Sequence, residues 1–218
     1  MQLDMFTPFP DLARDLLAHA LDENSDGSHD LSHLMRVWSN VVEISAEEGG
    51  DLRLLLAATL MHDCVHVEKT DPRRSLASRM SADRAETVLA DMGWAKHDIA
   101  QVTHAIVTHS YSAGLVPQSL EAEILQDADR LHAIGLVGVA RCFYVAGRSG
   151  AALYDPEDPR AEDRDLNDRR YALDHFETKL LKLSSGFLTG TGKRMAGIRH
   201  TRLERFRDGL LEEICRPG

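Results

Sequence analysis

Residues 52–63 read LRLLLAATLMHD, and this stretch is apolar on nearly every side until its last two positions. Ten such residues predict a helix over 52–61 that is buried all round. His62 and Asp63 follow at once, and both are side chains that bind divalent cations. Neighbouring helix positions diverge by about 100°, so the pair shares one ion more easily at a helix end than at its centre. The stretch therefore predicts a core helix that delivers two candidate metal ligands.

The rest of the chain shows helical spacing of apolar residues and lacks the alternation typical of strands. Glycines mark helix ends, as at Gly49-Gly50, and Ser28 is the expected cap of the helix that carries His33. The predicted helices are 10–21, 28–48, 52–61, 81–92, 98–109, 121–145 as one helix or two, 169–183 and 191–214. Residues 154–168 contain two prolines and many aspartates and glutamates, which predict an exposed loop.

We therefore expect an all-α fold, a single-domain helical bundle over residues 1–218. Its metal-binding core spans about residues 28–145, and its C-terminal helices span about 169–214. A length of 218 residues is enough for one sizeable core, and no stretch has the composition of a linker.

The charge balance limits the partners. Thirty-five acidic and 25 basic residues give a formal net charge of -10, which repels polymeric nucleic acid and anionic membranes. Small phosphorylated metabolites stay compatible, because a metal and a few cations invert the local potential. Cys64, Cys142 and Cys215 stand singly, which is typical of a reducing compartment. With no signal-peptide pattern at the start and no membrane-spanning length, we expect a cytoplasmic protein.

More candidate ligands lie far from the His62-Asp63 pair in sequence. His33 stands upstream, and Asp127 and Asp129 stand downstream. Two imidazoles and two carboxylates suit a divalent cation of intermediate hardness. The two aspartates point in nearly opposite directions on a helix, and periodicity does not choose between them. For an isolated His-Asp pair, a buried histidine satisfied by its neighbouring carboxylate is the alternative.

Four ordered segments together resemble the HD-domain metal-dependent phosphohydrolases, in particular their stand-alone, YedJ-like bacterial branch. The segments are SHDLSHLMRVW (28–38), LMHDCV (60–65), THSYSAG (108–114) and LQDADRLHAIGLVGVAR (125–141). The resemblance implies that His33, His62, Asp63 and Asp129 are the metal ligands. Asp129 is preferred because Ala-Asp-Arg-Leu is the form the superfamily takes at its fourth ligand, which leaves Asp127 to support a ligand or cap a helix. The implied cofactor is a divalent ion, with manganese, nickel, cobalt or iron favoured over magnesium.

The same resemblance suggests which residues act in catalysis. Asp63 is expected to act beside the ion. Many members carry an acidic residue three positions after the His-Asp pair, whereas this chain has His66, followed by Glu68. Imidazole serves as a base near neutral pH, so either His66 or Glu68 is a candidate to activate water. A surface position is the alternative for both.

Cations near the motifs are candidates to bind phosphate. They are Arg36, Lys69, Arg130, Arg141 and Lys179. His109 is expected to contact phosphate or a second metal, and His29, one turn before His33, to lie at the site. His104 is expected to be structural.

The function that the resemblance implies is hydrolysis of a nucleotide or a related small phosphorylated metabolite. Nucleoside triphosphate cleaved to monophosphate and pyrophosphate, through attack of a metal-bound hydroxide on phosphorus, is the specific form it suggests. Two alternatives stay open: an HD-type di-iron oxygenase and a non-catalytic metal-stabilised sensor module. No pattern in the chain indicates an oligomeric state.

Overall fold

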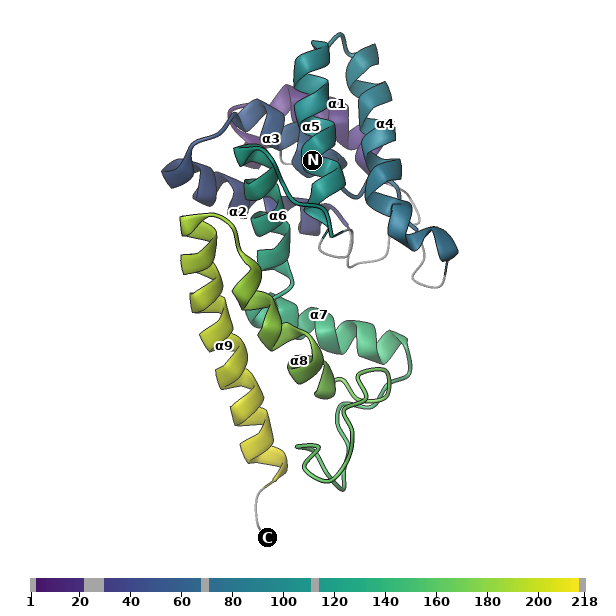
Figure 1. The fold of residues 1–218 in the computed structure, drawn as a ribbon, viewed down its shortest axis with the longest axis vertical. Coiled ribbons are helices and arrows are strands. Elements are labelled where there is room, and N and C mark those ends of the chain that lie inside the picture. Colours follow the sequence, from purple (N-terminus) through teal and green to yellow (C-terminus); the bar gives the residue numbers. More distant parts are fainter. Residues whose placement is uncertain (1–2, 22–29, 68–70, 111–113, 216–218) are drawn as a thin grey trace. The chain divides into compact units, whose positions relative to one another are not determined.

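The structure is a computed structural model that describes residues 3–21, 30–67, 71–110 and 114–215. Within these ranges it is all-α, as predicted, with one isolated bridge between Ala152 and Tyr171 and no strand (Figure 1). The helices are α1 (Pro10–Ala20), α2 (Leu31–Glu48), α3 (Leu52–Met61), α4 (Ala77–Asp91), α5 (Lys96–His109), α6 (Leu120–His132), α7 (Gly135–Arg148), α8 (Asp174–Thr178) and α9 (Gly190–Ile214), with 3-10 turns η1 (Asp4–Phe6), η2 (Pro72–Leu76) and η4 (Leu180–Gly186). None of the described helices combines the length and apolarity needed to cross a bilayer.

Contacts divide the chain into two compact units. The first unit comprises residues 1–129 with 188–191, and the second comprises 130–187 with 192–218. The chain passes between the units three times: within α6, just before α9 and in the first turn of α9. A single domain over residues 1–218 therefore stays a prediction, and each unit is described by itself.

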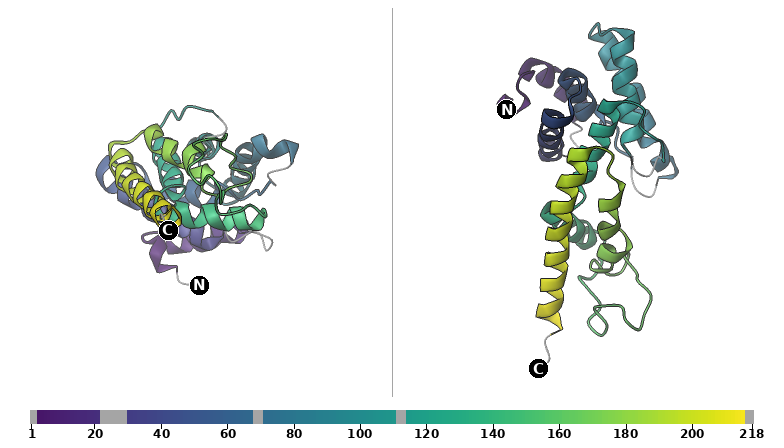
Figure 2. Two further views of the ribbon diagram at one scale, coloured as in Figure 1. Left: turned by 90° about the horizontal axis from the view of Figure 1, so that it is seen from below. Right: turned by 60° about the vertical axis from the view of Figure 1, so that its left-hand side comes forward.

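Helix α3 is the core of the first unit. Every residue from Leu54 to Met61 is buried, and the helix packs against α1, α2, α4 and α5. Asp51 caps its start by accepting hydrogen bonds from the backbone N–H groups of Arg53 (2.8 Å) and Leu54 (3.2 Å). The helix ends at Met61, so the predicted bounds 52–61 are confirmed. Helix α5 packs on α3, and α4 lies beside α5 in both Figure 1 and Figure 2.

Helix α2 begins later than expected. Asp30, not Ser28, is its N-cap, because the Asp30 carboxylate accepts a hydrogen bond from the backbone N–H of His33 at 3.1 Å. The predicted cap was therefore wrong, and Ser28 and His29 lie outside the described residues. The end was correct: the helix stops at Glu48, and Gly49 follows with a φ of 88°, which glycine adopts without strain.

Other boundaries differ for local reasons. Helix α4 begins at Ala77 rather than Ser81, because Asp71 caps a preceding 3-10 turn that runs directly into it. The range 121–145 holds two helices, α6 and α7, and the second starts at Gly135 with a φ of 70°. The bounds of α1, α5 and α9 lie within two residues of those predicted.

The predicted helix over 169–183 was wrong. Backbone groups of residues 170–173 pair with Ala152 and Leu153 instead of with their own helix: Ala152 N–H donates to Arg170 and Ala172 N–H donates back to Ala152, both at 2.9 Å. A residue engaged in such pairing cannot make helical hydrogen bonds. Only the short α8 and η4 remain of this prediction.

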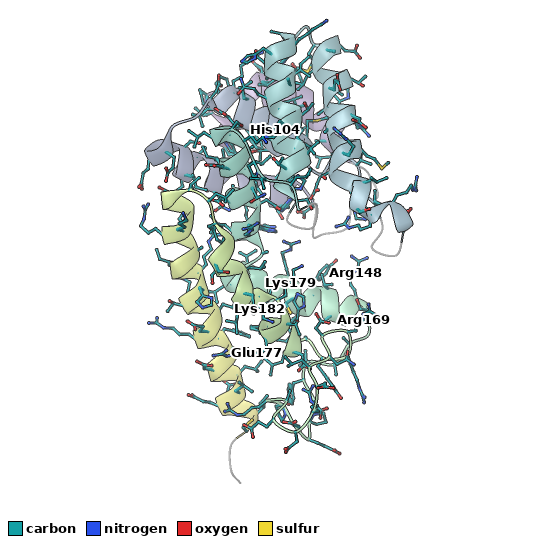
Figure 3. The ribbon with its side chains drawn as sticks, viewed as in Figure 1. His104, Arg148, Arg169, Glu177, Lys179 and Lys182 are labelled. Carbon is teal, nitrogen blue, oxygen red and sulfur yellow. The ribbon has the colours of Figure 1, made fainter. Side chains whose placement is uncertain are left out.

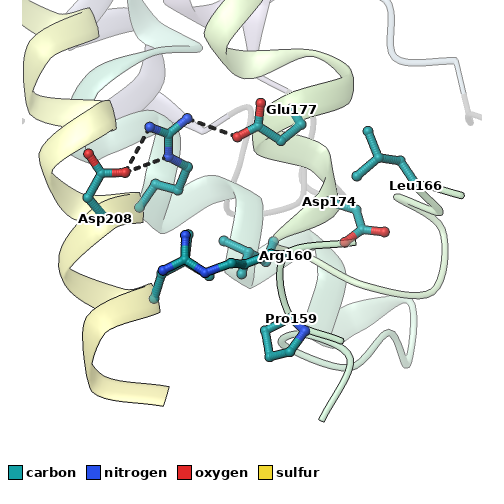
Figure 4. A pocket seen from close by; sticks show the side chains of 9 residues that line it. Pro159, Arg160, Leu166, Asp174, Glu177 and Asp208 are labelled. Carbon is teal, nitrogen blue, oxygen red and sulfur yellow. Dashed lines mark hydrogen bonds and ion pairs between the residues drawn. The ribbon is translucent and has the colours of Figure 1, made fainter. Parts of the chain in front are cut away.

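The acidic loop over 154–168 is organised around one arginine of the second unit. Arg164 bridges Asp155 (3.3 Å) and the buried Asp174 (2.6 Å). Asp174 also lines a cavity of about 250 Å³, drawn in Figure 4. In that cavity Arg207 is held by Glu177 (2.9 Å) and Asp208 (2.8 Å). The candidate metal ligands and the predicted phosphate-binding cations are not among the described residues that line it.

Candidate metal centre

Four helices of the first unit each bring a side chain to one cluster. His33 comes from α2, His109 from the last position of α5 and Asp129 from α6, while His62 and Asp63 directly follow α3. They form two groups of three, His33–His62–Asp129 and His62–Asp63–His109, and the potential ligand atoms in each lie within 4.8 Å of one another. The structure thus brings together residues that lie up to 96 positions apart in the chain.

The distances in the first group fit a single cation. The Nε2 atoms of His33 and His62 are 3.2 Å apart, and they lie 3.8 Å and 3.9 Å from Oδ1 of Asp129. Two ligands of one ion, each bonded at about 2.1 Å, are at most about 4.2 Å apart. All three separations are below this limit. Two imidazoles and a carboxylate are also a donor set that divalent transition metals accept.

Two histidines are oriented by the ends of their own helices. Nδ1 of His62 lies 2.7 Å from the carbonyl of Thr59, and Nδ1 of His109 lies 2.6 Å from the carbonyl of Ile106. A carbonyl oxygen can only accept a hydrogen bond. Nδ1 therefore carries the hydrogen, and in the neutral ring the Nε2 lone pair faces the cluster. Each helix end thus sets the tautomer that metal binding requires.

Asp63 lies between the two histidines of the second group. Its Oδ2 lies 3.6 Å from Nε2 of His62, and its Oδ1 lies 3.6 Å from Nε2 of His109. Burial disfavours a charged imidazolium, but the Asp63 carboxylate, with Asp129 further away, outweighs that penalty and raises the pKa of His109. The carboxylates therefore make the cluster attractive to a positive charge.

Asp127 and Asp129 occupy different environments. Asp127 is fully buried, and its carboxylate accepts hydrogen bonds from the backbone N–H of Leu188 (2.9 Å) and from the N–H and hydroxyl of Thr189 (both 2.8 Å). Asp129 is 29% exposed and lies beside His33 and His62. The structure therefore places Asp129 in the cluster, whereas Asp127 binds the segment that contains Leu188 and Thr189.

The remaining groups near the His62-Asp63 pair differ in accessibility. His66 is exposed, whereas Glu68 and Lys69 lie outside the described residues. Cys64 is buried and donates from Sγ to the carbonyl of Ser81 at 3.6 Å. Burial raises the pKa of its thiol to about 11, so it is protonated near neutrality and is a poor ligand or nucleophile.

Of the predicted phosphate-binding cations, Arg36 belongs to the first unit, on the same helix as His33. Its Nη1 donates to Ser32 Oγ at 2.9 Å. His104 also belongs to this unit, where it lies on α5 (Figure 3) and accepts a hydrogen bond from the Gln118 N–H at 3.0 Å. It takes no part in either group, in line with the structural role expected for it.

Arg130, Arg141 and Lys179 belong to the second unit. Arg130 is buried, donates to the carbonyl of Gly186 and lies over the ring of Phe187. Arg141 contacts His132 at 2.6 Å, and Lys179 directly follows α8 (Figure 3). Both arginines thus have partners within the protein, and phosphate binding by the three residues stays a prediction.

Comparison with known proteins gives concordant matches. A model of the HD domain family matches residues 30–134, a range that includes all five residues of the cluster. YpgQ of Bacillus subtilis (strain 168) is 33% identical over 202 residues, which cover 91% of this chain and 89% of YpgQ. An HD-superfamily hydrolase from Bacillus thuringiensis has a TM-score of 0.72 at 28% identity, covering 93% of this chain and 96% of its own. The crystal structure of Bacillus subtilis YpgQ in complex with ADP has a TM-score of 0.70 at 30% identity, covering 99% of this chain and 97% of the YpgQ chain.

Proposed function

Because the chain belongs to the HD-domain superfamily of hydrolases, we propose that it hydrolyses a phosphate ester or anhydride bond in a nucleotide or a related small metabolite. The observation that carries this proposal is the convergence of His33, His62 and Asp129, with Asp63 beside them, at separations that suit one divalent cation. These four residues are the ligands we propose.

A bound divalent ion would polarise a phosphate oxygen and lower the pKa of water, which is the chemistry that hydrolysis near neutral pH requires. His33 and His62 would present neutral nitrogens to it, and the two aspartates would offset its charge. Imidazole ligands favour manganese, cobalt, nickel or iron over magnesium.

The exposure of the cluster favours an enzyme over a structural metal site. His33 and His62 are almost completely buried, whereas Asp63 is 32% and Asp129 29% exposed. Solvent and a phosphate group therefore have access on the carboxylate side. A purely structural site is closed to solvent, which argues against the sensor module.

A nucleotide is the substrate class that we propose. The support is the relative YpgQ, which was crystallised in complex with ADP and matches nearly the whole of this chain. We further propose cleavage of a nucleoside triphosphate to monophosphate and pyrophosphate, with Arg36 and Lys69 among the cations that bind the phosphates. His66 or Glu68 is proposed to activate water, since His66 is exposed three positions after Asp63.

One observation favours the di-iron oxygenase as a second candidate. The group His62–Asp63–His109 supplies a third histidine, which a two-metal centre needs. His104 is engaged with Gln118 and does not extend this set. Hydrolysis is therefore preferred, and a requirement for molecular oxygen separates the two.

The proposal is tested with a panel of nucleoside mono-, di- and triphosphates. We expect chelation to abolish hydrolysis, and manganese, cobalt or nickel to restore it better than magnesium, because the ligand set is rich in nitrogen. The measurement is release of phosphate or pyrophosphate by the treated protein. The variant His104→Ala, which changes a histidine outside the cluster, should behave as the wild type. Turnover unchanged after complete metal removal would refute the metal-dependent mechanism.

A further inference from the structure

Two buried side-chain amides hold the backbone next to candidate ligands. The first is Asn40 on α2, which is 4% exposed. Its Nδ2 donates to the carbonyl of Ala128 at 2.9 Å, and Ala128 directly precedes Asp129. Asn40 lies two helical turns after His33, so both lie on the same face of α2. That face meets α6 at two points, the Asp129 carboxylate and the carbonyl one residue earlier.

The second amide is Gln126 on α6, which is 6% exposed. Its Nε2 donates to the carbonyl of Thr108 at 2.7 Å, and Thr108 directly precedes His109. Helix α5 ends at His109, so the Thr108 carbonyl belongs to the last turn and has no partner within the helix. Gln126 supplies that partner from α6.

We propose that Asn40 and Gln126 are positioning residues of the metal centre, which set α6 against α2 and α5 at the residue before a member of the cluster. The proposal rests on the metal site of the proposed function and extends it to two residues outside the ligand set. A neutral amide suits this task, because it donates to a buried carbonyl without the desolvation cost of a charge, whereas a carboxylate would repel the carbonyl.

The placement of the two amides argues against a role in general stability alone. Any buried amide needs a hydrogen-bond partner. Here both amides join different ligand-bearing helices, and both choose the carbonyl immediately before a member of the cluster. A shift of α6 along either neighbour would therefore move Asp129 relative to His33, or His109 relative to Asp129.

The test replaces each amide by an apolar side chain of similar size, as Asn40→Leu and Gln126→Met. The affinity of the purified protein for cobalt(II) is measured by visible absorption in competition with a chelator. We expect each variant to lose about 10- to 100-fold in affinity, the usual effect of removing a group that supports a metal ligand. The cobalt absorption spectrum at saturation should also change, because the ligands are no longer held in the same arrangement.

Matched controls are the neighbouring core residues Val41 and Leu125, both fully buried. Val41→Ala and Leu125→Ala create cavities beside the same positions without removing an amide, and their Tm is compared with that of the amide variants. They should keep the cobalt affinity and the cobalt spectrum of the wild type even where their Tm is lowered as much as that of the amide variants. If Asn40→Leu fails to fold, Asn40→Ser is measured by the same criterion.

Wild-type cobalt affinity in both amide variants would overturn the proposal. It would also be overturned if the control variants lost as much cobalt affinity as the amide variants at the same Tm. Because cobalt binding is measured without substrate, the result does not depend on turnover. A wild-type protein that binds cobalt but cleaves no nucleotide would refute the proposed function and leave this inference standing.

Discussion

His62→Ala is expected to remove bound metal and to lower kcat/KM by more than about 100-fold, since even residues that only support a ligand are worth 10- to 100-fold. His62 belongs to both groups of the cluster and is completely buried, and its Nε2 lies 3.2 Å from that of His33. No other residue of the cluster belongs to both groups. Metal content by elemental analysis, together with the kinetics, measures the effect.

The control for this prediction is a variant that loses stability without losing a ligand. Removal of a buried imidazole also leaves a cavity, which lowers the stability of the metal-free protein. Leu60→Ala creates a comparable cavity in α3, the helix that directly precedes His62, without changing a residue of the cluster, and it should keep its metal. A folded His62→Ala protein with full metal content and wild-type turnover would contradict the assignment.

The second prediction separates the two aspartates of α6. Asp129→Ala should lose metal and activity, because it removes a carboxylate that lies beside two histidines. Asp127→Ala should instead lower the free energy of unfolding by about 3 kcal/mol, because the donors of Leu188 and Thr189 lose their buried acceptor. Denaturant unfolding and metal analysis of both variants measure the contrast. Metal loss in Asp127→Ala with full occupancy in Asp129→Ala would mean that the fourth ligand is misassigned.

The core of the fold could be predicted from local pattern. Residues 52–61 are apolar on nearly every side, and a helix with that pattern is expected to be buried, so α3 was expected with its observed bounds. Residues 169–183 show where this reasoning fails. Their apolar spacing is helical, yet their backbone pairs with Ala152 and Leu153, an interaction that no local pattern reveals.

The candidate site shows the same division between local and long-range information. His62 and Asp63 stand out because they end a buried helix. The choice between Asp127 and Asp129 depends on a segment about 60 residues away, where Leu188 and Thr189 donate to Asp127. Asn40 and Gln126 were not identified at all, because a polar residue on a helix gives no sign that its side chain will be buried against the backbone of another helix. His109 was expected to contact phosphate or a second metal, and the structure places it beside Asp63.

The most direct test of the central claim is hydrolysis of a nucleoside triphosphate in oxygen-18 water. If water attacks the α-phosphorus, label appears in the monophosphate, pyrophosphate leaves unlabelled, and exclusion of molecular oxygen does not slow turnover. Label in inorganic phosphate instead would mark attack at the terminal group and correct the scissile bond. Turnover that requires molecular oxygen and leaves every phosphate-containing product unlabelled would contradict the account of this protein as a phosphohydrolase.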